Sequence, residues 1–201
     1  MVTPDDALTA AAANATAPAA AAARPSPRPS VEAVWEALGA VPDPEIPVVS
    51  VVELGIVRDV EWDDAAPHAI VVRVTPTYSG CPATELIIHG IRDALAALGV
   101  AELRLEIRLS PPWTTEWITP DARIKLREFG IAPPAGDGAP MAVARVDVTG
   151  ISPLRRMSVV VPCPRCDSRK TTLLSQFGST ACKAQYRCDD CLEPFDYFKP
   201  H

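Results

Sequence analysis

The residues best suited to chemistry are two Cys-x-x-Cys pairs near the C-terminal end of the chain, Cys163 with Cys166 and Cys188 with Cys191. Each such turn brings two sulfur atoms within reach of one ion, so two turns offer four thiolates in a tetrahedron. Zinc accepts this set in a closed structural site, and mononuclear iron uses the same ligands. Disulfides or free thiols are the alternative. A filled four-thiolate site has no open position, so the pairs predict a structural or partner-binding unit instead of catalysis at the metal.

A separate cysteine, Cys81, stands in a polar, turn-rich loop with the sequence TPTYSGCP. The following residue, Pro82, suits the first position of a helix, so we expect Cys81 to be the N-cap of that helix. A helix N-terminus carries partial positive charge and unpaired N–H groups, and both favour a thiolate. Cys81 is therefore a candidate nucleophile or metal ligand. The alternative is a small buried residue that happens to cap a helix.

Two acidic residues, Asp43 and Glu45, are the nearest candidates for companions of Cys81. Three prolines hold them on a stiff loop, VPDPEIP, which cannot be a helix or a central strand. Turn chemistry and contact with solvent would explain the same two residues. Cys182 breaks the spacing of the two pairs, and we interpret it as a buried thiol of the metal unit or as a reactive one.

The composition argues against several classes of partner. The chain has 201 residues, a net charge of −6 and a hydrophobic content of 48%, which supports a packed core. An acidic chain argues against binding to nucleic acid or to an anionic membrane surface through bulk charge. No apolar run reaches the length of a membrane span, and the Ala-rich N-terminus has no basic leader. We therefore expect a cytoplasmic protein, in which reduced cysteines favour metal over disulfides.

Changes of composition divide the chain into four segments. Residues 1–29 are rich in Ala, Pro, Ser and Thr, and we expect a disordered leader because they bury too little apolar surface. Residues 30–130 carry the periodic apolar patterns of helices and strands. Residues 131–158 are expected to be a linker. Residues 159–201 hold the paired cysteines and form a metal ribbon that is too small to build a core alone.

The second segment predicts the order helix, strand, strand, helix, strand, helix. Ser30 caps the first helix, a strand through Trp62 forms a hairpin with residues 69–75, and Thr119 and Gly130 bound the last helix. The middle helix, 82–98, and the third strand, 101–109, have long apolar faces: Ala83, Leu86, Ile87, Ile91, Ala94, Leu95 and Leu98 in the helix, and Leu103, Leu105, Ile107 and Leu109 in the strand. The fold class is therefore α+β: a small mixed-sheet sandwich with helices on one face and a C-terminal zinc-ribbon unit.

Three stretches of the second segment together resemble the small iron–sulfur assembly domain of the SufT-like family: DPEIP at 43–47, ELGIV at 53–57 and TPTYSGCP at 75–82. The resemblance runs from about Val31 to Phe129 and does not include the leader. Near the C-terminus, the stretches QFGSTACKAQYRC and CLEPFDYFK look like one branch of that family, the PaaD branch, which is associated with the phenylacetyl-CoA epoxidase system.

The resemblance implies an accessory or maturation factor for a multicomponent epoxidase in aerobic phenylacetate catabolism, and not the catalyst of epoxidation. It implies that Cys81 is the functional thiol, with transient iron or an iron–sulfur cluster as its cargo, and that Asp43 and Glu45 belong to the signature loop. The partners that it implies are the oxygenase, which holds a di-iron centre, and the reductase, which holds an iron–sulfur cluster.

Two other functions fit the same residues. A structural, non-catalytic subunit would stay in the oxygenase complex and use its acidic surface, with Trp113 and Trp117, as an interface. Ordinary core packing would explain both tryptophans equally. A rubredoxin-like electron-transfer module would hold iron on the four paired cysteines, a ligand set that zinc shares.

Overall fold

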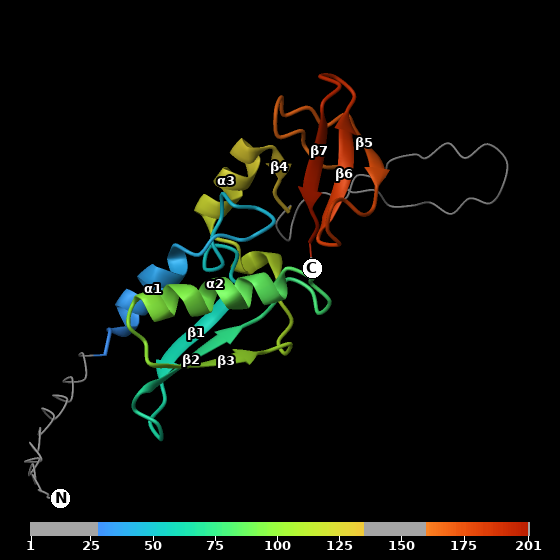
Figure 1. Cartoon of the computed structure of the whole chain (residues 1–201). Helices are drawn as coiled ribbons and strands as arrows, with labels where there is room; N and C mark the ends of the chain where they lie inside the picture. The colour runs from blue at the N-terminus through green and yellow to red at the C-terminus, as the bar shows by residue number, and fades with distance from the viewer. Residues whose placement is uncertain (1–27, 135–159, 201) are drawn as a thin grey trace, which may run out of the picture.

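The computed structural model describes residues 28–134 and 160–200 of the chain (Figure 1). Residues 1–27, 135–159 and 201 lie outside the described ranges, and they contain most of the expected leader and most of the expected linker. We call residues 28–130 the N-terminal unit and residues 160–200 the ribbon unit. None of the described helices is long and apolar enough to cross a bilayer.

A three-stranded sheet forms the centre of the N-terminal unit, with the strand order β1–β2–β3. The antiparallel pairing of β1 (Val57–Trp62) with β2 (Ala69–Val74) confirms the expected hairpin. β3 (Glu102–Ile107) pairs parallel with β2, so α2 (Thr84–Ala97) forms the crossover that a parallel pair requires. The sheet is therefore mixed, as the sequence predicts.

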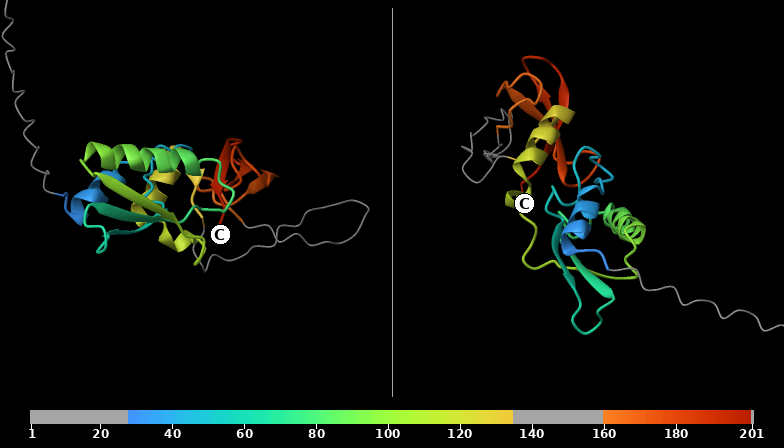
Figure 2. Two further views of the ribbon diagram at one scale, coloured as in Figure 1. Left: turned by 60° about the horizontal axis from the view of Figure 1, so that its bottom comes forward. Right: turned by 90° about the vertical axis from the view of Figure 1, so that its left-hand side faces the viewer.

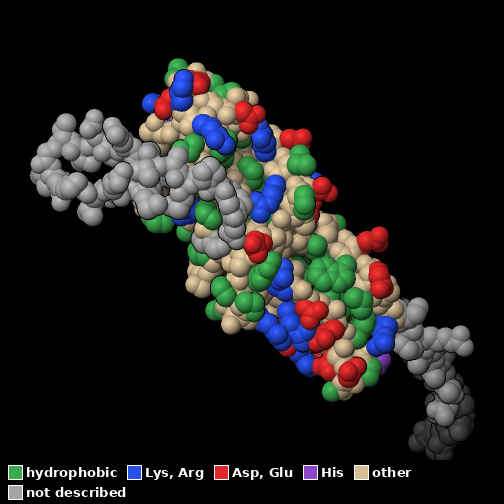
Figure 3. Space-filling view, turned by 180° about the vertical axis from the view of Figure 1, so that it is seen from behind, with side chains coloured by type: hydrophobic (Ala, Val, Ile, Leu, Met, Phe, Trp, Pro, Cys, Tyr) green, Lys and Arg blue, Asp and Glu red, His purple; other side chains and the backbone are tan. Residues whose placement is uncertain are grey.

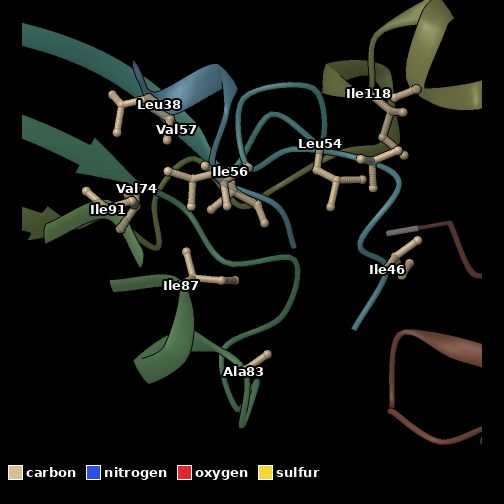
Figure 4. Close-up of a cluster of buried hydrophobic side chains, with 14 of the residues drawn as sticks. Leu38, Ile46, Leu54, Ile56, Val57, Val74, Ala83, Ile87, Ile91 and Ile118 are labelled. Carbon is tan, nitrogen blue, oxygen red and sulfur yellow. The ribbon is translucent and has the colours of Figure 1, made fainter. Parts of the chain in front are cut away.

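Two helices cover one face of this sheet (Figure 2). α1 (Val31–Gly39) begins where the Ser30 side chain accepts a hydrogen bond from the backbone N–H of Ala33 at 3.1 Å, as expected of its N-cap. α1 contacts β1, and α2 contacts both β3 and α1. Buried apolar side chains from the helices, the strands and the loop after α1 form one cluster (Figure 4), which includes Leu38, Leu54, Val74, Ile87 and Ile91.

The buried face of α2 differs from the predicted one. Leu86 is 61% exposed, and Ile88 is buried instead, together with Ile87, Ile91 and Leu95. Residues 86–88 are all apolar, so the sequence does not determine which two of these three side chains face the core. In the structure, Ile87 and Ile88 are the two that are buried.

The inward face of β3 is also shorter than predicted. Leu103 and Leu105 pack against the core, but Ile107 and Leu109 are 50% and 56% exposed. β3 is an edge strand, and the helices do not cover this end of its face. Alternation predicts which side chains share a face, but it does not predict how far a helix covers that face.

The last helix has the predicted ends. α3 (Pro120–Phe129) follows a short 3₁₀ helix, η1 (Thr115–Trp117). The hydroxyl of Thr119 accepts a hydrogen bond from the backbone N–H of Ala122 at 3.2 Å, and Gly130 ends the helix with a φ of +96°.

A second sheet has four strands in the order β4–β7–β6–β5. β5 (Thr171–Ser175), β6 (Lys183–Cys188) and β7 (Pro194–Phe198) are antiparallel and form the ribbon unit. β4 (Ile131–Ala132) comes from the start of the segment expected to be a linker, and it pairs parallel with β7. The chain that leaves α3 is therefore built into the sheet of the ribbon unit.

The ribbon unit and β4 have a small apolar cluster of their own, although the sequence predicts a ribbon too small to build a core, and two further ribbon residues enter the core of the N-terminal unit. Phe198 of β7 and Cys182, just before β6, belong to the buried cluster of the N-terminal unit. The ring centroid of Phe198 lies 5.9 Å from that of Trp113, whose indole N–H donates a hydrogen bond to the carbonyl oxygen of Leu54 at 2.9 Å. Trp113 is only 3% exposed, so it packs between the units and not on an outer interface. Trp117 is half-buried and lies under the guanidinium of Arg58.

Acidic and basic side chains interleave on the rear of the molecule (Figure 3). In the three-stranded sheet Arg73 forms ion pairs with Asp59, Glu61 and Glu106. The arginine is partly buried and the three carboxylates are more exposed. Ion pairs open to solvent typically contribute below about 1 kcal/mol each. Three carboxylates face one arginine here, so this strand surface is net negative and offers no concentrated positive charge for a nucleic acid.

Candidate functional site

The four paired cysteines meet in the ribbon unit, and their sulfur atoms all lie within 4.8 Å of one another. The Sγ atoms of Cys163 and Cys191 are 3.7 Å apart, and those of Cys166 and Cys188 are 3.6 Å apart. A tetrahedral ion with metal–sulfur distances of about 2.3 Å places its sulfur ligands about 3.8 Å apart. A disulfide would place two sulfur atoms about 2.05 Å apart. The geometry and the donor set therefore form a metal-binding cluster.

Two turns of the same construction hold these cysteines. In each turn the N–H of the first cysteine donates to the carbonyl oxygen five residues later, at 2.9 Å in the first turn and 3.0 Å in the second. The residue after the second cysteine has a positive φ in both turns, 62° for Asp167 and 65° for Leu192. The backbone N–H of Cys191 donates to the sulfur of Cys188 and helps lower the pKa of Cys188 to about 7. A hydrogen bond with Cys188 raises the pKa of Cys166 to about 12, and burial and the same sulfur raise that of Cys191, so the turn favours the thiolate at Cys188 and a metal would displace the protons of its neighbours.

A second group of chemically active side chains lines one cavity between the two units. Asp43 and Glu45 come from the proline-rich loop, Cys81 from the loop before α2, and Cys182 from the stretch before β6. The cavity has a volume of about 20 Å³. Figure 4 shows Ile46, another lining residue, at the end of the apolar cluster nearest the ribbon unit. The fold therefore brings together the three residues that the sequence singles out and adds a thiol from the ribbon unit.

Cys81 does not occupy the helix N-cap, which corrects the sequence expectation. The N-cap of α2 is Ala83, and Cys81 closes a turn ahead of the helix. Its N–H donates to the carbonyl oxygen of Tyr78 at 3.3 Å, and its own carbonyl oxygen accepts from the N–H of Thr84 at 3.2 Å. Pro82 stands in this extra turn, so its preference for a helix start places the helix two residues too early. The Cys81 side chain is partly exposed and packs against the core.

Asp43 is a buried carboxylate that organises its own loop. Its Oδ1 accepts hydrogen bonds from the backbone N–H groups of Glu45 at 2.9 Å and Ile46 at 2.8 Å. Burial raises the pKa of Asp43, although these two bonds and the charge of Lys183 act in the opposite direction. The Asp43 side chain therefore stabilises the turn through hydrogen bonds, as the alternative explanation expects, but it is buried beside the cavity and does not face solvent. Glu45 is exposed.

Cys182 is buried, as the first of its two sequence interpretations expects, but it packs in the core of the N-terminal unit. It is 7% exposed, and its Sγ lies 3.0 Å from the hydroxyl of Thr180. Burial raises the pKa of Cys182, and the charges of Cys81 and Asp43 raise it further. The spacing to Cys188 shows that Cys182 falls outside the metal cluster, but no local pattern links it to Cys81, which is about a hundred residues away in the sequence.

Comparison with known families gives one match in each unit. Residues 31–102 match the family model described as iron–sulfur cluster assembly protein. Residues 151–199 match the model described as PaaD zinc beta ribbon domain. The first match contains Asp43 and Cys81, and the second contains Cys182 and the four clustered cysteines.

Individual relatives show the same division. A proposed subunit of the 1,2-phenylacetyl-CoA epoxidase of Escherichia coli (strain K12) is 48% identical over 171 residues, which are 85% of this chain and 93% of that protein. The Fe-S protein maturation auxiliary factor YitW of Bacillus subtilis (strain 168) is 37% identical over 97 residues, 47% of this chain and 91% of that protein. A crystal structure of a domain of unknown function, DUF59, from Bacillus anthracis is 32% identical, covers 47% of this chain and 89% of its own, and has a TM-score of 0.43.

Proposed function

Because the chain belongs to the PaaD family of phenylacetyl-CoA epoxidase subunits, we propose that it is an accessory factor that matures the metal centres of that multicomponent epoxidase. It would assist assembly of the iron–sulfur cluster of the reductase or the di-iron centre of the oxygenase, and it would not itself carry out the epoxidation. Similarity to a Fe-S protein maturation auxiliary factor over the N-terminal unit supports this role.

The observation that carries the proposal is the separation of two kinds of cysteine site. The four clustered thiols fill a tetrahedron among themselves, so they leave no position for exchange. Cys81 instead is partly exposed, lies outside that cluster and lines a cavity with Asp43 and Glu45. A thiol in such a position is able to take up and release iron or a cluster, whereas the closed site is not.

We assign a structural role to the metal of the ribbon unit, and zinc is the ion that the matched family description favours. The four cysteines Cys163, Cys166, Cys188 and Cys191 would hold it. The metal would fix a sheet that carries Phe198 into the N-terminal unit, so its contribution to folding extends to the Cys81 cavity. We also propose that the protein works in the cytoplasm on the oxygenase and reductase subunits, in contact with neither nucleic acid nor membrane.

The test is maturation of the epoxidase in cells. The oxygenase and reductase are produced with the wild-type chain, with Cys81→Ala, or with Ser79→Ala, an exposed residue of the same loop. Iron and acid-labile sulfide are then measured in the purified oxygenase and reductase, together with epoxidase activity. We expect Cys81→Ala to lower the metal content of one of these proteins severalfold and Ser79→Ala to leave it unchanged.

Equal iron, sulfide and activity with wild type and Cys81→Ala would contradict the proposal. If the variant also stayed bound to the oxygenase, the chain would be a structural subunit instead. Co-purification of the Cys81→Ala variant with its partners therefore separates the two functions.

A further inference from the structure

We propose that Cys182 of the ribbon unit is a second thiol ligand in the Cys81 cavity, and that Cys81, Cys182 and Asp43 together bind one divalent transition-metal ion. The inference rests on the proposed function, because it names the form in which the cargo is held: a single ion such as Fe²⁺. The ribbon unit then completes a binding site that the N-terminal unit alone does not possess.

The two thiols come from different units and yet line the same cavity, Cys81 from the N-terminal unit and Cys182 from the ribbon unit, with Asp43 as a third lining residue. Cys182 is fixed there by two contacts, because its carbonyl oxygen accepts from the N–H of Lys199 at 2.9 Å and its sulfur lies 3.0 Å from the Thr180 hydroxyl. If Cys182 served packing alone, it would not need to line a cavity or to lie opposite a thiol of the other unit.

The buried carboxylate of Asp43 has an oxygen available to an ion. Both of its hydrogen bonds from the backbone fall on Oδ1, so its second oxygen is left for another ligand. Two thiolates and one carboxylate are donors that Fe²⁺ and Zn²⁺ accept. Three donors do not fill a tetrahedron, and the remaining position suits an ion that must be passed to another protein. Among the described residues only the four paired cysteines are gathered closely enough to form a metal-binding group, so Cys81, Cys182 and Asp43 would have to move toward one another to bind an ion.

Charge and size also fit a single cation. Burial is the main cause of the raised pKa of Cys182; Cys81 and Asp43, which line the same cavity, would add charge repulsion if all three groups were ionised. A bound cation removes this repulsion and favours both thiolates. The buried ammonium of Lys183 would oppose a cation in this region, but it lies 3.6 Å from the carboxylate of Asp196, which offsets its charge. A cavity of about 20 Å³ has room for one ion or water molecule and not for a larger organic ligand.

The test uses the full chain with zinc already in the ribbon unit, titrated without oxygen with Co²⁺ as a coloured probe for Fe²⁺. The wild type should bind one Co²⁺ beyond its zinc and show thiolate-to-cobalt charge-transfer absorption in the near ultraviolet. Cys182→Ser keeps a hydroxyl for the contact with Thr180 but removes the thiolate, and we expect it to weaken cobalt binding at least tenfold. Cys81→Ser should act similarly, and Ser79→Ala serves as the matched control.

Zinc analysis after the titration checks that cobalt has not replaced the ribbon ion, and unchanged thermal unfolding checks that Cys182→Ser still folds. If that variant unfolds, Cys182→Ala, which adds no polar group to the buried position, takes its place. Cobalt absorption in Cys182→Ser equal to that of the wild type would overturn the inference.

The maturation assay distinguishes this failure from failure of the proposed function. If Cys81→Ala lowers the iron of the client and Cys182→Ser does not, the maturation role stands and the two-thiol site is wrong. If neither variant lowers it, both are wrong.

Discussion

Removal of the Phe198 side chain should disrupt the packing between the two units and destabilise the protein. Phe198 belongs to the ribbon unit but is 1% exposed in the core of the N-terminal unit, where its ring packs against Trp113. Truncation of a buried phenylalanine to alanine typically costs about 3–5 kcal/mol. The lost ring contact accounts for about 0.5–1.5 kcal/mol of this. Because many domains of this size are stable by only about 5–15 kcal/mol, the effect should be large.

Phe177 provides a matched control, because it is the same residue type in the same unit. It is 64% exposed, and its ring contacts the ammonium of Lys199 at 4.6 Å from the ring centroid. An exposed contact of this kind contributes about 0.5–1 kcal/mol, so Phe177→Ala should cost no more than about 1 kcal/mol. The difference between the two variants therefore isolates burial between the units.

The assay is urea unfolding of the metal-loaded protein, followed by tryptophan fluorescence and by far-ultraviolet circular dichroism. We expect one transition for the wild type by both probes, and a much larger loss of stability for Phe198→Ala than for Phe177→Ala. Equal losses in the two variants, or separate transitions of the two units in the wild type, would refute the shared core.

Three further perturbations follow from local geometry. Gly55→Ala should destabilise the protein by more than about 1 kcal/mol in thermal or urea unfolding, because φ of Gly55 is +68° and a new Cβ would lie 2.5 Å from Cβ of Trp117. Gly39→Ala is the control, because Gly39 has open space around it, and it should be neutral or stabilising. A greater loss of stability in Gly39→Ala than in Gly55→Ala would contradict this reasoning. Burial raises the pKa of Asp43 above 3.8, so the contribution of this carboxyl group to stability is present below pH 3.8 and is lost as the pH rises through the folded-state pKa. Asp43→Asn should therefore raise the urea midpoint at pH 7 but not at pH 3. An equal gain at both pH values would exclude the charge of Asp43 as the cause. Chelation of the ribbon metal should abolish the near-ultraviolet circular dichroism of Tyr186 and Tyr197, which pack together in the ribbon unit, with a re-metallated sample as the control. A signal that survives metal loss would show that the ribbon unit folds without metal.

Local signals in the sequence were sufficient for the elements of the N-terminal unit. The caps at Ser30 and Thr119 and the stop at Gly130 act within one helical turn, so residue type alone defines those ends. The hairpin and the order of elements follow from apolar periodicity and turn residues. The four clustered cysteines likewise meet through two local turns of fixed spacing.

What the sequence could not supply depends on contacts between distant residues. The pairing of β4 with β7 needs two residues after α3 to meet the end of the chain, and so short a strand has no periodicity of its own. The meeting of Cys81 and Cys182 in one cavity follows from that docking and from the burial of Phe198. The expected N-cap at Cys81 was wrong for a local reason, since proline also fits the turn that precedes a helix.

The measurement that tests the central claim most directly is the metal and sulfide content of wild type and Cys81→Ala, both purified without oxygen from cells that express the epoxidase subunits. We expect about one zinc per chain in both proteins, held by the clustered cysteines, and additional iron only in the wild type. One zinc in both proteins and iron in neither would leave the ribbon unit as the sole metal site and contradict a cargo-carrying role for Cys81.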